Sequence, residues 1–413
     1  MRLLTAALAA LSLASTAVLA APPLFGAGPL AFENKPGSPV VGVYVPGWEG
    51  VEQLDKIKPG SLSHILYAFL RICGPGQLEK DAKTCAGRPE FSLTDTELER
   101  RFDAGFVALK KRLPALQVVA SVGGWGGSDP FFHLANDAAK RQVFAKDVVR
   151  FLREHPGFDG IDIDWEHPGG NGSANGVALG SPADGQGYAD LMVDLRAAVD
   201  QLGRETGRRY LVTTAVNSSS TIVDRIKFRQ AAPALDLVFM MTYDFFGPWT
   251  DTAGHHAALK SARKTDDSVE RSVANLVKAG VPRAKLVAGV AMYGRGFAGV
   301  TSKQGHGAAK TGNYPDNGDG STVYRELRAD RLDAQGRGLN GWVVQHDKQA
   351  AAFSLYQPEQ KLWISYDDPR AVLEKGRYAR RAGLAGVFAW ELSQDHEGEL
   401  LNAMNLGVGK KPR

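Results

Sequence analysis

Acidic side chains are concentrated in a segment that otherwise has the composition of a buried strand, FDGIDIDWEHPGG at residues 158–170. Side chains alternate along a strand, so Asp162, Asp164 and Glu166 share one face, and the apolar residues between them share the other. If this strand belongs to a barrel, the apolar face packs against surrounding helices and the three carboxylates line the lumen.

Three like charges in a row cost free energy to bury, and this cost suggests that the row takes part in a chemical reaction. The row can relieve it by sharing protons and by raising the pKa of at least one member. Glu166, at the C-terminal end of the strand, would reach the barrel mouth, where active sites lie. An acid that keeps its proton near neutral pH beside a second carboxylate is what cleavage of a glycosidic bond requires.

Two other interpretations of the row remain. The carboxylates could bond backbone amides at a polar strand end, although buried acids rarely come three to a face. They could also bind a hard cation, but no second acidic or histidine cluster in the sequence supports a metal site, and we expect none. Asp159 lies off the shared face, and a structural role where the strand starts explains it better.

Eight short apolar segments, each beside turn residues, predict buried strands. Amphipathic segments between most of them predict helices, for example residues 94–113, where Thr94 and Glu97 have the capping-box spacing. This alternation predicts the α/β class and a (β/α)8 TIM barrel. A doubly wound sheet is the alternative, but no glycine-rich phosphate motif follows a strand. The expected strands are residues 40–45, 63–70, 116–124, 158–166, 210–217, 235–245, 285–294 and 383–392.

The chain divides into four regions by composition. Residues 1–20 have one arginine, an Ala/Leu-rich stretch and a small-residue cleavage site, which together predict a secretory signal peptide. Residues 21–39 are rich in proline and glycine and predict an extended leader. Residues 40–296 and 367–400 would form the barrel. Residues 297–366 are too long for one crossover, and their short strand-like runs predict a small α+β insertion between strands 7 and 8.

Charge and cysteine content exclude some classes of function. The formal net charge of +4 comes from 49 basic and 45 acidic residues, a weak basis for nucleic-acid binding. No segment after the signal is apolar enough to span a membrane. Cys73 and Cys85 lack the CxxC spacing of zinc and redox sites, so in an exported chain we expect them to close a small loop as a disulfide.

The acidic strand also resembles a known family. DGIDIDWE has the D-x-x-D-x-D-x-E form of the family-18 glycoside hydrolases, the chitinases and their relatives. Four further motifs are similar to the chitinase branch in order and spacing, and the insertion resembles that of one chitinase subfamily. They are SVGG (121–124), MTYDFFGPW (241–249), MYGRGF (292–297) and FAWEL (388–392).

The resemblance implies roles for the acidic row. Glu166 would protonate the leaving glycosidic oxygen and later activate water as a base. Family 18 is substrate-assisted, so the 2-acetamido carbonyl of the sugar would attack the anomeric carbon. Asp164 would bond the acetamido N–H, and Asp162 would share a proton with Asp164. Tyr243 would donate a hydrogen bond to the acetamido oxygen.

The resemblance also implies a set of substrate contacts. Trp390 would form the floor under the cleaved sugar, Trp125 and Trp249 would stack on flanking sugars, and Met241 would pack beneath the acetamido methyl. Ser121 has no nucleophile elbow around it, so we expect it to support the acidic row by a hydrogen bond. The remaining expected substrate contacts are Tyr44, Asp244 and Arg295.

These inferences predict a secreted, retaining chitinase that acts on chitin or on soluble β-1,4-linked N-acetylglucosamine oligomers. We expect a monomer in an extracellular or periplasmic location, with no cofactor and no nucleic-acid or membrane partner. One alternative is a sugar-binding lectin on the same fold, although such relatives lose the catalytic glutamate and this chain keeps Glu166. The other is an endo-β-N-acetylglucosaminidase that acts on N-glycans; the insertion, the tryptophans and the Tyr243–Asp244 pair favour chitin.

Overall fold

The computed structural model describes residues 23–35, 37–316 and 318–413. The expected signal peptide, residues 1–20, therefore lies outside the described residues, as do the first residues of the expected leader. No helix in these ranges combines the length and the apolar character needed to cross a bilayer.

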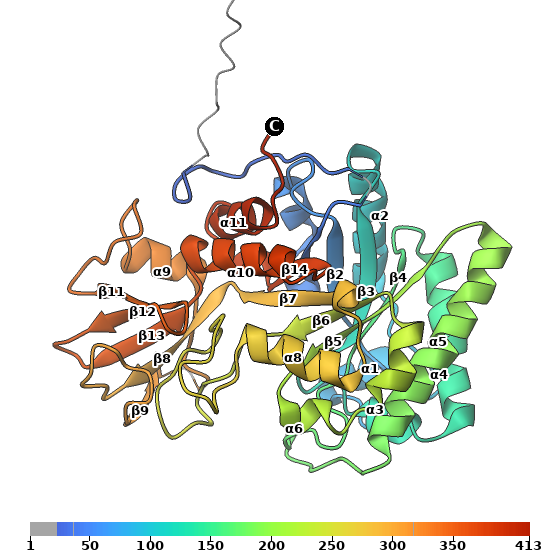
Figure 1. Cartoon of the computed structure of the whole chain (residues 1–413). Coiled ribbons are helices and arrows are strands. Elements are labelled where there is room, and N and C mark those ends of the chain that lie inside the picture. The colour runs from blue at the N-terminus through green and yellow to red at the C-terminus, as the bar shows by residue number, and fades with distance from the viewer. Residues whose placement is uncertain (1–22, 36, 317) are drawn as a thin grey trace, which may run out of the picture.

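A closed barrel of parallel strands forms the centre of the protein (Figure 1). Each strand pairs with its neighbour in sequence, and β14 closes the ring by pairing with β1 and with β7. The prediction of a TIM barrel is confirmed, and each of the eight apolar segments contains one barrel strand. The strands are β1 (Val40–Pro46), β2 (His64–Leu70), β3 (Gln117–Gly123), β4 (Gly160–Asp164), β5 (Leu211–Asn217), β6 (Leu237–Met241), β7 (Leu286–Ala291) and β14 (Gly386–Trp390).

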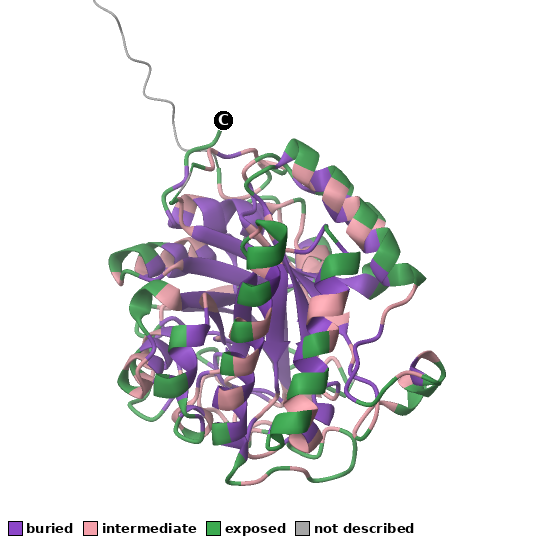
Figure 2. Ribbon diagram, turned by 90° about the vertical axis from the view of Figure 1, so that its right-hand side faces the viewer, coloured by how far each residue is buried: buried purple, intermediate pink, exposed green. Residues whose placement is uncertain are grey.

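Helices surround the barrel with their exposed faces outward, as Figure 2 shows by burial. The longer ones are α2 (Glu97–Arg112), α4 (Ala138–Glu154), α5 (Asp184–Thr206), α8 (Val269–Ala279), α10 (Pro369–Arg381) and α11 (Glu399–Gly407). The shorter ones are α1 (Ala82–Cys85), α3 (Pro130–Leu134), α6 (Ser220–Val223), α7 (Phe228–Ala231) and α9 (Tyr324–Asp330).

Helix α2 begins two residues later than its sequence suggested. The capping box pairs Thr96 with Glu99, whose carboxylate accepts from the Thr96 backbone N–H at 2.7 Å, in place of the expected Thr94 and Glu97. Thr94 instead pairs with the end of β2, because its hydroxyl accepts from the Arg71 N–H at 2.9 Å. Two overlapping Thr/Glu pairs have the same spacing, and this tertiary contact selects between them.

Alternate side chains of the barrel strands pack into two apolar layers. One layer fills the space between the strands and the helices and contains Ile161, Ile163 and Trp165 of the acidic segment. The other lies inside the barrel and includes Val119, Phe239 and other side chains from several strands. The acidic side chains of the same segment therefore point into the lumen, on the face opposite the isoleucines.

The insertion forms a separate antiparallel sheet beside the barrel (Figure 1, orange to red). Strand β8 (Tyr293–Ala298) belongs to this sheet and follows β7 after Met292 alone, so the insertion begins before the expected boundary at residue 297. The apolar run of residues 285–294 hid this change because it continues through both strands. The other strands are β9 (Gly312–Tyr314), β10 (Ser321–Val323), β11 (Val343–Asp347), β12 (Ala352–Gln357) and β13 (Leu362–Tyr366).

The leader is extended and packs on the C-terminal helix. Phe32 is fully buried and forms a bridge with Pro412, and the Gly26 N–H donates to the Glu399 carboxylate at 2.8 Å. The expected disulfide between Cys73 and Cys85 is present in the segment that joins β2 to α2.

Candidate active site

The acidic row occupies the C-terminal end of β4, at the barrel mouth. Asp162 is completely buried and Asp164, the last residue of the strand, is 3% exposed. Glu166 follows two residues later with its side chain partly exposed, so it is the member of the row that solvent and a ligand can reach. Trp165 anchors the segment from behind by stacking on Phe131 of α3.

Asp162 is held by three hydroxyl groups from three different strands. Its carboxylate accepts from Ser121 at 2.7 Å, from Thr213 at 2.6 Å and from Tyr44 at 3.3 Å. Barrel register places Ser121, Asp162 and Thr213 at one level of β3, β4 and β5. Burial raises the pKa of Asp162 to about 6, and these hydrogen bonds oppose the rise. We did not single out Thr213 from the sequence, because nothing local distinguishes it from any other strand threonine.

Asp164 has no such set of donors. Its Oδ1 atom is buried without a hydrogen-bond partner, while its backbone carbonyl accepts from the Gly124 N–H at 2.9 Å. Burial, followed by the charges of Glu166 and Asp162, raises the pKa of Asp164 well above its ordinary value. An unpartnered buried carboxyl oxygen at the mouth of a barrel is available to a ligand.

Glu166 is positioned through its backbone and through one amide. Its N–H donates to Ser128 Oγ at 3.1 Å, and the Trp125 N–H donates to its carboxylate. Burial and the charge of Asp244 raise the pKa of Glu166, which keeps it protonated near neutral pH. His167 Nε2 is 3.8 Å away, but burial lowers the pKa of His167 and leaves it neutral. The charge of Glu166 in turn contributes to the raised pKa of Asp164.

Tyr243 and Met241 reach the same mouth from the end of β6. Tyr243 is 8% exposed, and burial raises its hydroxyl pKa well above the ordinary value, so it stays a hydrogen-bond donor. Met241 is the last residue of β6 and is half-buried beside the lumen cluster.

Asp244 is a carboxylate of a different kind. Arg295 of β8 binds both its oxygens, at 2.8 and 2.9 Å, and His256 Nδ1 lies 3.6 Å from one of them. Burial alone would raise the pKa of Asp244, but the hydrogen bonds and charges of His256 and Arg295 lower it below its ordinary value. Arg295 is itself buried between Trp249 and Tyr293, so its contacts are with the protein.

Exposed aromatic rings border the acidic row. Trp125 is 61% exposed and Trp249 is 59% exposed. Trp390, at the end of β14, is half-buried, and Phe69 at the end of β2 stacks on it at 5.7 Å and 22°. We did not predict Phe69, because an aromatic residue in an apolar strand is ordinary in sequence. Trp48, 61% exposed, lies 6.4 Å from Trp390 and extends the aromatic line.

Tyr44 does not lie where a substrate contact should be. It is 1% exposed, its ring packs under Trp390 at 5.0 Å and its hydroxyl is used by Asp162. Its position on a fully buried strand explains the difference from our expectation. Tyr44 therefore supports Asp162 from behind.

Asp159 lies apart from the row, at the start of β4. Its carboxylate contacts Lys110 at 2.5 Å, Arg208 at 3.1 Å and the Val118 N–H at 2.8 Å. These contacts join α2, β3 and the segment before β5, which is the structural place expected for it.

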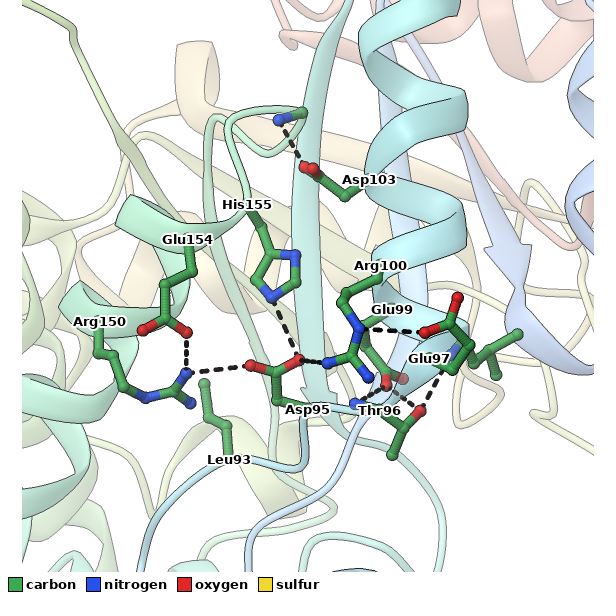
Figure 3. A network of polar contacts seen from close by, with 12 residues as sticks. Leu93, Asp95, Thr96, Glu97, Glu99, Arg100, Asp103, Arg150, Glu154 and His155 are labelled. Atoms are coloured by element: carbon green, nitrogen blue, oxygen red, sulfur yellow. Dashed lines mark hydrogen bonds and ion pairs between the residues drawn. The ribbon is translucent and has the colours of Figure 1, made fainter.

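The described residues contain one group whose atoms could together hold a metal, and it lies outside the mouth. Asp95, Glu154 and His155 place ligand atoms within 4.8 Å of one another. Arg150 already lies among them, with Nη1 3.0 Å from Asp95 and 2.5 Å from Glu154 (Figure 3). A guanidinium bound to two of the three ligands makes this an ion-pair network that joins α2 to α4.

Comparison with known proteins agrees with the geometry. The family model Glycosyl hydrolases family 18 matches residues 40–395. The chain is 34% identical to Chitinase A of Pseudoalteromonas piscicida, over 89% of this chain and 52% of that protein. It is also 34% identical to the chitinase of Autographa californica nuclear polyhedrosis virus, over 90% of this chain and 73% of that protein. The chain thus spans about half the length of the first of these relatives.

A solved structure shares the architecture. The family 18 N-acetylglucosaminidase of Paenibacillus barengoltzii superposes with a TM-score of 0.75 and 30% identity, over 89% of this chain and 99% of that one. The barrel, the acidic row at its mouth and these matches lead to one conclusion: this chain belongs to family 18 of the glycosyl hydrolases.

Proposed function

We propose that the protein is an exported chitinase that cleaves β-1,4 bonds between N-acetylglucosamine units with retention of configuration. One observation carries this proposal: the buried Asp164–Glu166 pair has a raised proton affinity and lies beside exposed tryptophans. The pair supplies an acid at neutral pH, and the rings supply flat apolar surfaces for sugars.

Glu166 starts the reaction as the acid. It is the one partly exposed member of the row, and its raised pKa keeps a proton for the leaving glycosidic oxygen. After the leaving sugar departs, the Glu166 carboxylate takes a proton from a water molecule as that water attacks the anomeric carbon and displaces the acetamido oxygen. The Trp125 N–H on the Glu166 carboxyl stabilises this ionised form.

The substrate supplies the nucleophile, because the nearby carboxylates are unsuited to attack. Asp162 is completely buried under three hydroxyl donors, and Arg295 occupies both oxygens of Asp244. The acetamido oxygen of the bound sugar attacks its own anomeric carbon, with Tyr243 donating to that oxygen. The free Oδ1 of Asp164 accepts the acetamido N–H and stabilises the positive charge of the oxazolinium ion.

The aromatic line sets the path of the chain. Trp390 lies under the sugar at the cleavage point, with Phe69 and Tyr44 packed behind it. Trp125 and Trp249 then stack on sugars on either side. Rigid rings lose little conformational entropy on binding, so they suit repeated apolar sugar faces.

A second candidate is an N-acetylglucosaminidase that releases single sugars. The resemblance to the Paenibacillus barengoltzii enzyme favours it. The two activities use the same acid and differ in the length of the product.

The test is hydrolysis of a chitin penta- or tetrasaccharide by the wild-type protein and by Glu166→Gln, with product anomers followed by NMR. Release of β-anomers of two or more sugars supports a retaining chitinase, and release of monomers alone supports the second candidate. The Glu166→Gln variant should bind the oligosaccharide without turning it over. Binding without cleavage by the wild type would contradict both candidates and make the protein a lectin.

Two features of the chain support export of the protein. It rests on the sequence of residues 1–20 and on a disulfide that is expected in an oxidising compartment. Mass analysis of the mature N-terminus after expression should locate cleavage after Ala20. An intact N-terminus in the cytoplasmic fraction would count against export.

A further inference from the structure

Arg71 is a cation at the barrel mouth to which the proposed mechanism gives no role. It follows the last residue of β2, so it lies at the end of the barrel that carries Glu166. Its guanidinium donates through Nη1 to the Gly123 carbonyl, at the end of β3. Its backbone N–H donates to Thr94 Oγ1, which fixes the start of the side chain.

The guanidinium lies against the loop Gly123–Gly127 without space for a side chain. A Cβ atom on Gly127 would be 1.8 Å from Arg71 Nη1, and one on Gly124 would be 2.6 Å from the Phe69 ring. Arg71 also stacks over that ring at 5.3 Å. The loop therefore rests on Arg71 and Phe69, and its glycines permit this close approach.

The loop in turn contacts both members of the acid pair. The Gly124 N–H donates to the Asp164 carbonyl at 2.9 Å, and the Trp125 N–H donates to the Glu166 carboxylate. On the other side, Phe69 stacks on Trp390 under the proposed cleavage point. The guanidinium of Arg71 thus supports the loop that carries the Trp125 donor to Glu166. Through Phe69 it also supports the Trp390 ring, which is proposed to lie under the cleaved sugar.

Its charge also reaches the row. Arg71 faces Asp164 and Asp81, and burial lowers its pKa without making it neutral, because a guanidinium holds its proton at all ordinary pH values. It is the cation that opposes the rise in the pKa of Asp164. His167, whose Nε2 lies 3.8 Å from Glu166, has a pKa that burial lowers, so it is neutral. The other groups that face Asp164 or its pair are acids or phenols: Asp162 and Glu166 beside β4, Tyr44 of β1, Tyr188 of α5, and Tyr243 and Asp244 after β6.

We infer that Arg71 is a positioning residue for the glycosidase reaction, which holds the Gly123–Gly127 loop against the acid pair and supplies the positive charge that faces Asp164. This inference rests on the proposed function for its kinetic consequences. Its structural part, the link between Arg71 and the charge of Asp164, does not depend on any substrate.

The kinetic test compares Arg71→Lys, which keeps the charge, with Arg71→Met, which keeps the length alone. The control is Arg101→Met, an exposed arginine of α2 paired with Glu52 at 3.5 Å. Rates on chitin tetrasaccharide are measured from pH 4 to 9. In Arg71→Met, we expect kcat at the optimum to fall about tenfold, and both limbs of the kcat/KM profile to move up by about half to one pH unit.

The lysine variant separates charge from shape. We expect both limbs of the kcat/KM profile of Arg71→Lys to stay at the wild-type pH values. Its kcat should fall, because an ammonium group cannot both stack on Phe69 and fill the space beside the loop. Limbs at the wild-type pH in Arg71→Met, or a rise in KM with kcat unchanged, would overturn the inference. Arg101→Met should match the wild type in both quantities.

A second measurement needs no activity. Loss of Arg71 leaves the Asp164–Glu166 pair more reluctant to ionise in the folded state, so the melting temperature of Arg71→Met should fall further below that of the wild type as pH rises from 5.5 to 8.5. A difference in melting temperature independent of pH would overturn the charge role even if the protein proved not to cleave chitin; a wild type without turnover would instead refute the proposed function.

Discussion

Two groups of carboxylates in this protein have opposite electrostatic character. The row of Asp162, Asp164 and Glu166 is buried with hydroxyl and amide donors, and the pKa values of its members are raised. The network around Asp95 is held by arginines and a histidine (Figure 3), with Arg150 at 3.0 Å and His155 at 3.3 Å. A hydrogen bond from His155, then one from Arg150, lowers the pKa of Asp95 to about 2.

The difference explains why one group can do acid–base chemistry and the other cannot. A carboxylate bound by guanidinium groups is ionised throughout the physiological range, so it has no proton to give. A buried carboxyl that no guanidinium binds directly retains its proton and can transfer it. Asp244 shows that the local partners decide, because it lies at the same mouth as Glu166 and yet His256 and Arg295 keep it ionised.

The largest effect should come from Asp164→Asn. This substitution keeps the size of the side chain and removes the acid that stabilises the intermediate, so we expect kcat on chitin tetrasaccharide to fall about 10²- to 10³-fold. The melting temperature at pH 7.5 should stay the same or rise, because the substitution removes a buried carboxyl group whose ionisation is costly. A stable variant with wild-type kcat would contradict the role given to Asp164.

The matched substitution in the network is Asp95→Asn, and it should give the reverse result. Removing the charge takes from Arg150 and His155 the carboxylate that they share, although Arg150 keeps its contact with Glu154. We expect a loss of about 2 kcal/mol in the free energy of unfolding. Activity at 25 °C should be unchanged. Urea denaturation followed by circular dichroism measures the first quantity, and a loss of kcat in the folded variant would erase the distinction between the two groups.

The two groups should also respond to pH with opposite sign. The folded pKa of Asp95 lies below its unfolded value near 4, so its stabilisation is present above about pH 4 and is lost as pH falls towards 2. The folded pKa of Asp162 lies above the unfolded value, so the folded state loses stability as pH rises from about 4 through 6. Melting curves from pH 2 to 8 should show Asp95→Asn flattening the acid side alone.

The smallest effect should come from Glu154→Gln. Glu154 contacts Arg150 at 2.5 Å, but its side chain is 53% exposed, and exposed pairs contribute little. We expect a change below about 0.5 kcal/mol in the free energy of unfolding, smaller in high salt. A loss as large as that of Asp95→Asn would show that the whole network, and not Asp95 alone, holds α4 to α2.

The sequence alone determined the faces of the acidic strand, the barrel class and the disulfide. Strand alternation is a local property, so the residues from Asp162 to Glu166 were sufficient to place three acids on one face and the isoleucines on the other. Eight apolar segments separated by helical ones predicted the barrel, because burial on both faces leaves a strong and repeated signal. The cysteine spacing predicted the disulfide, because Cys73 and Cys85 lie close together along the chain.

The tertiary structure decided which groups meet. Barrel register brought Thr213 to Asp162 across a sequence separation of 51 residues, and the close packing of Arg71 on the glycine loop has no local signature. The barrel also places the Tyr44 hydroxyl on Asp162, and β8 places Arg295 on Asp244. The sequence predicts substrate contacts for Tyr44 and Arg295, and the structure gives both side chains partners within the protein. A carboxylate's proton affinity depends on its neighbours in space, and those neighbours are fixed only when the barrel closes.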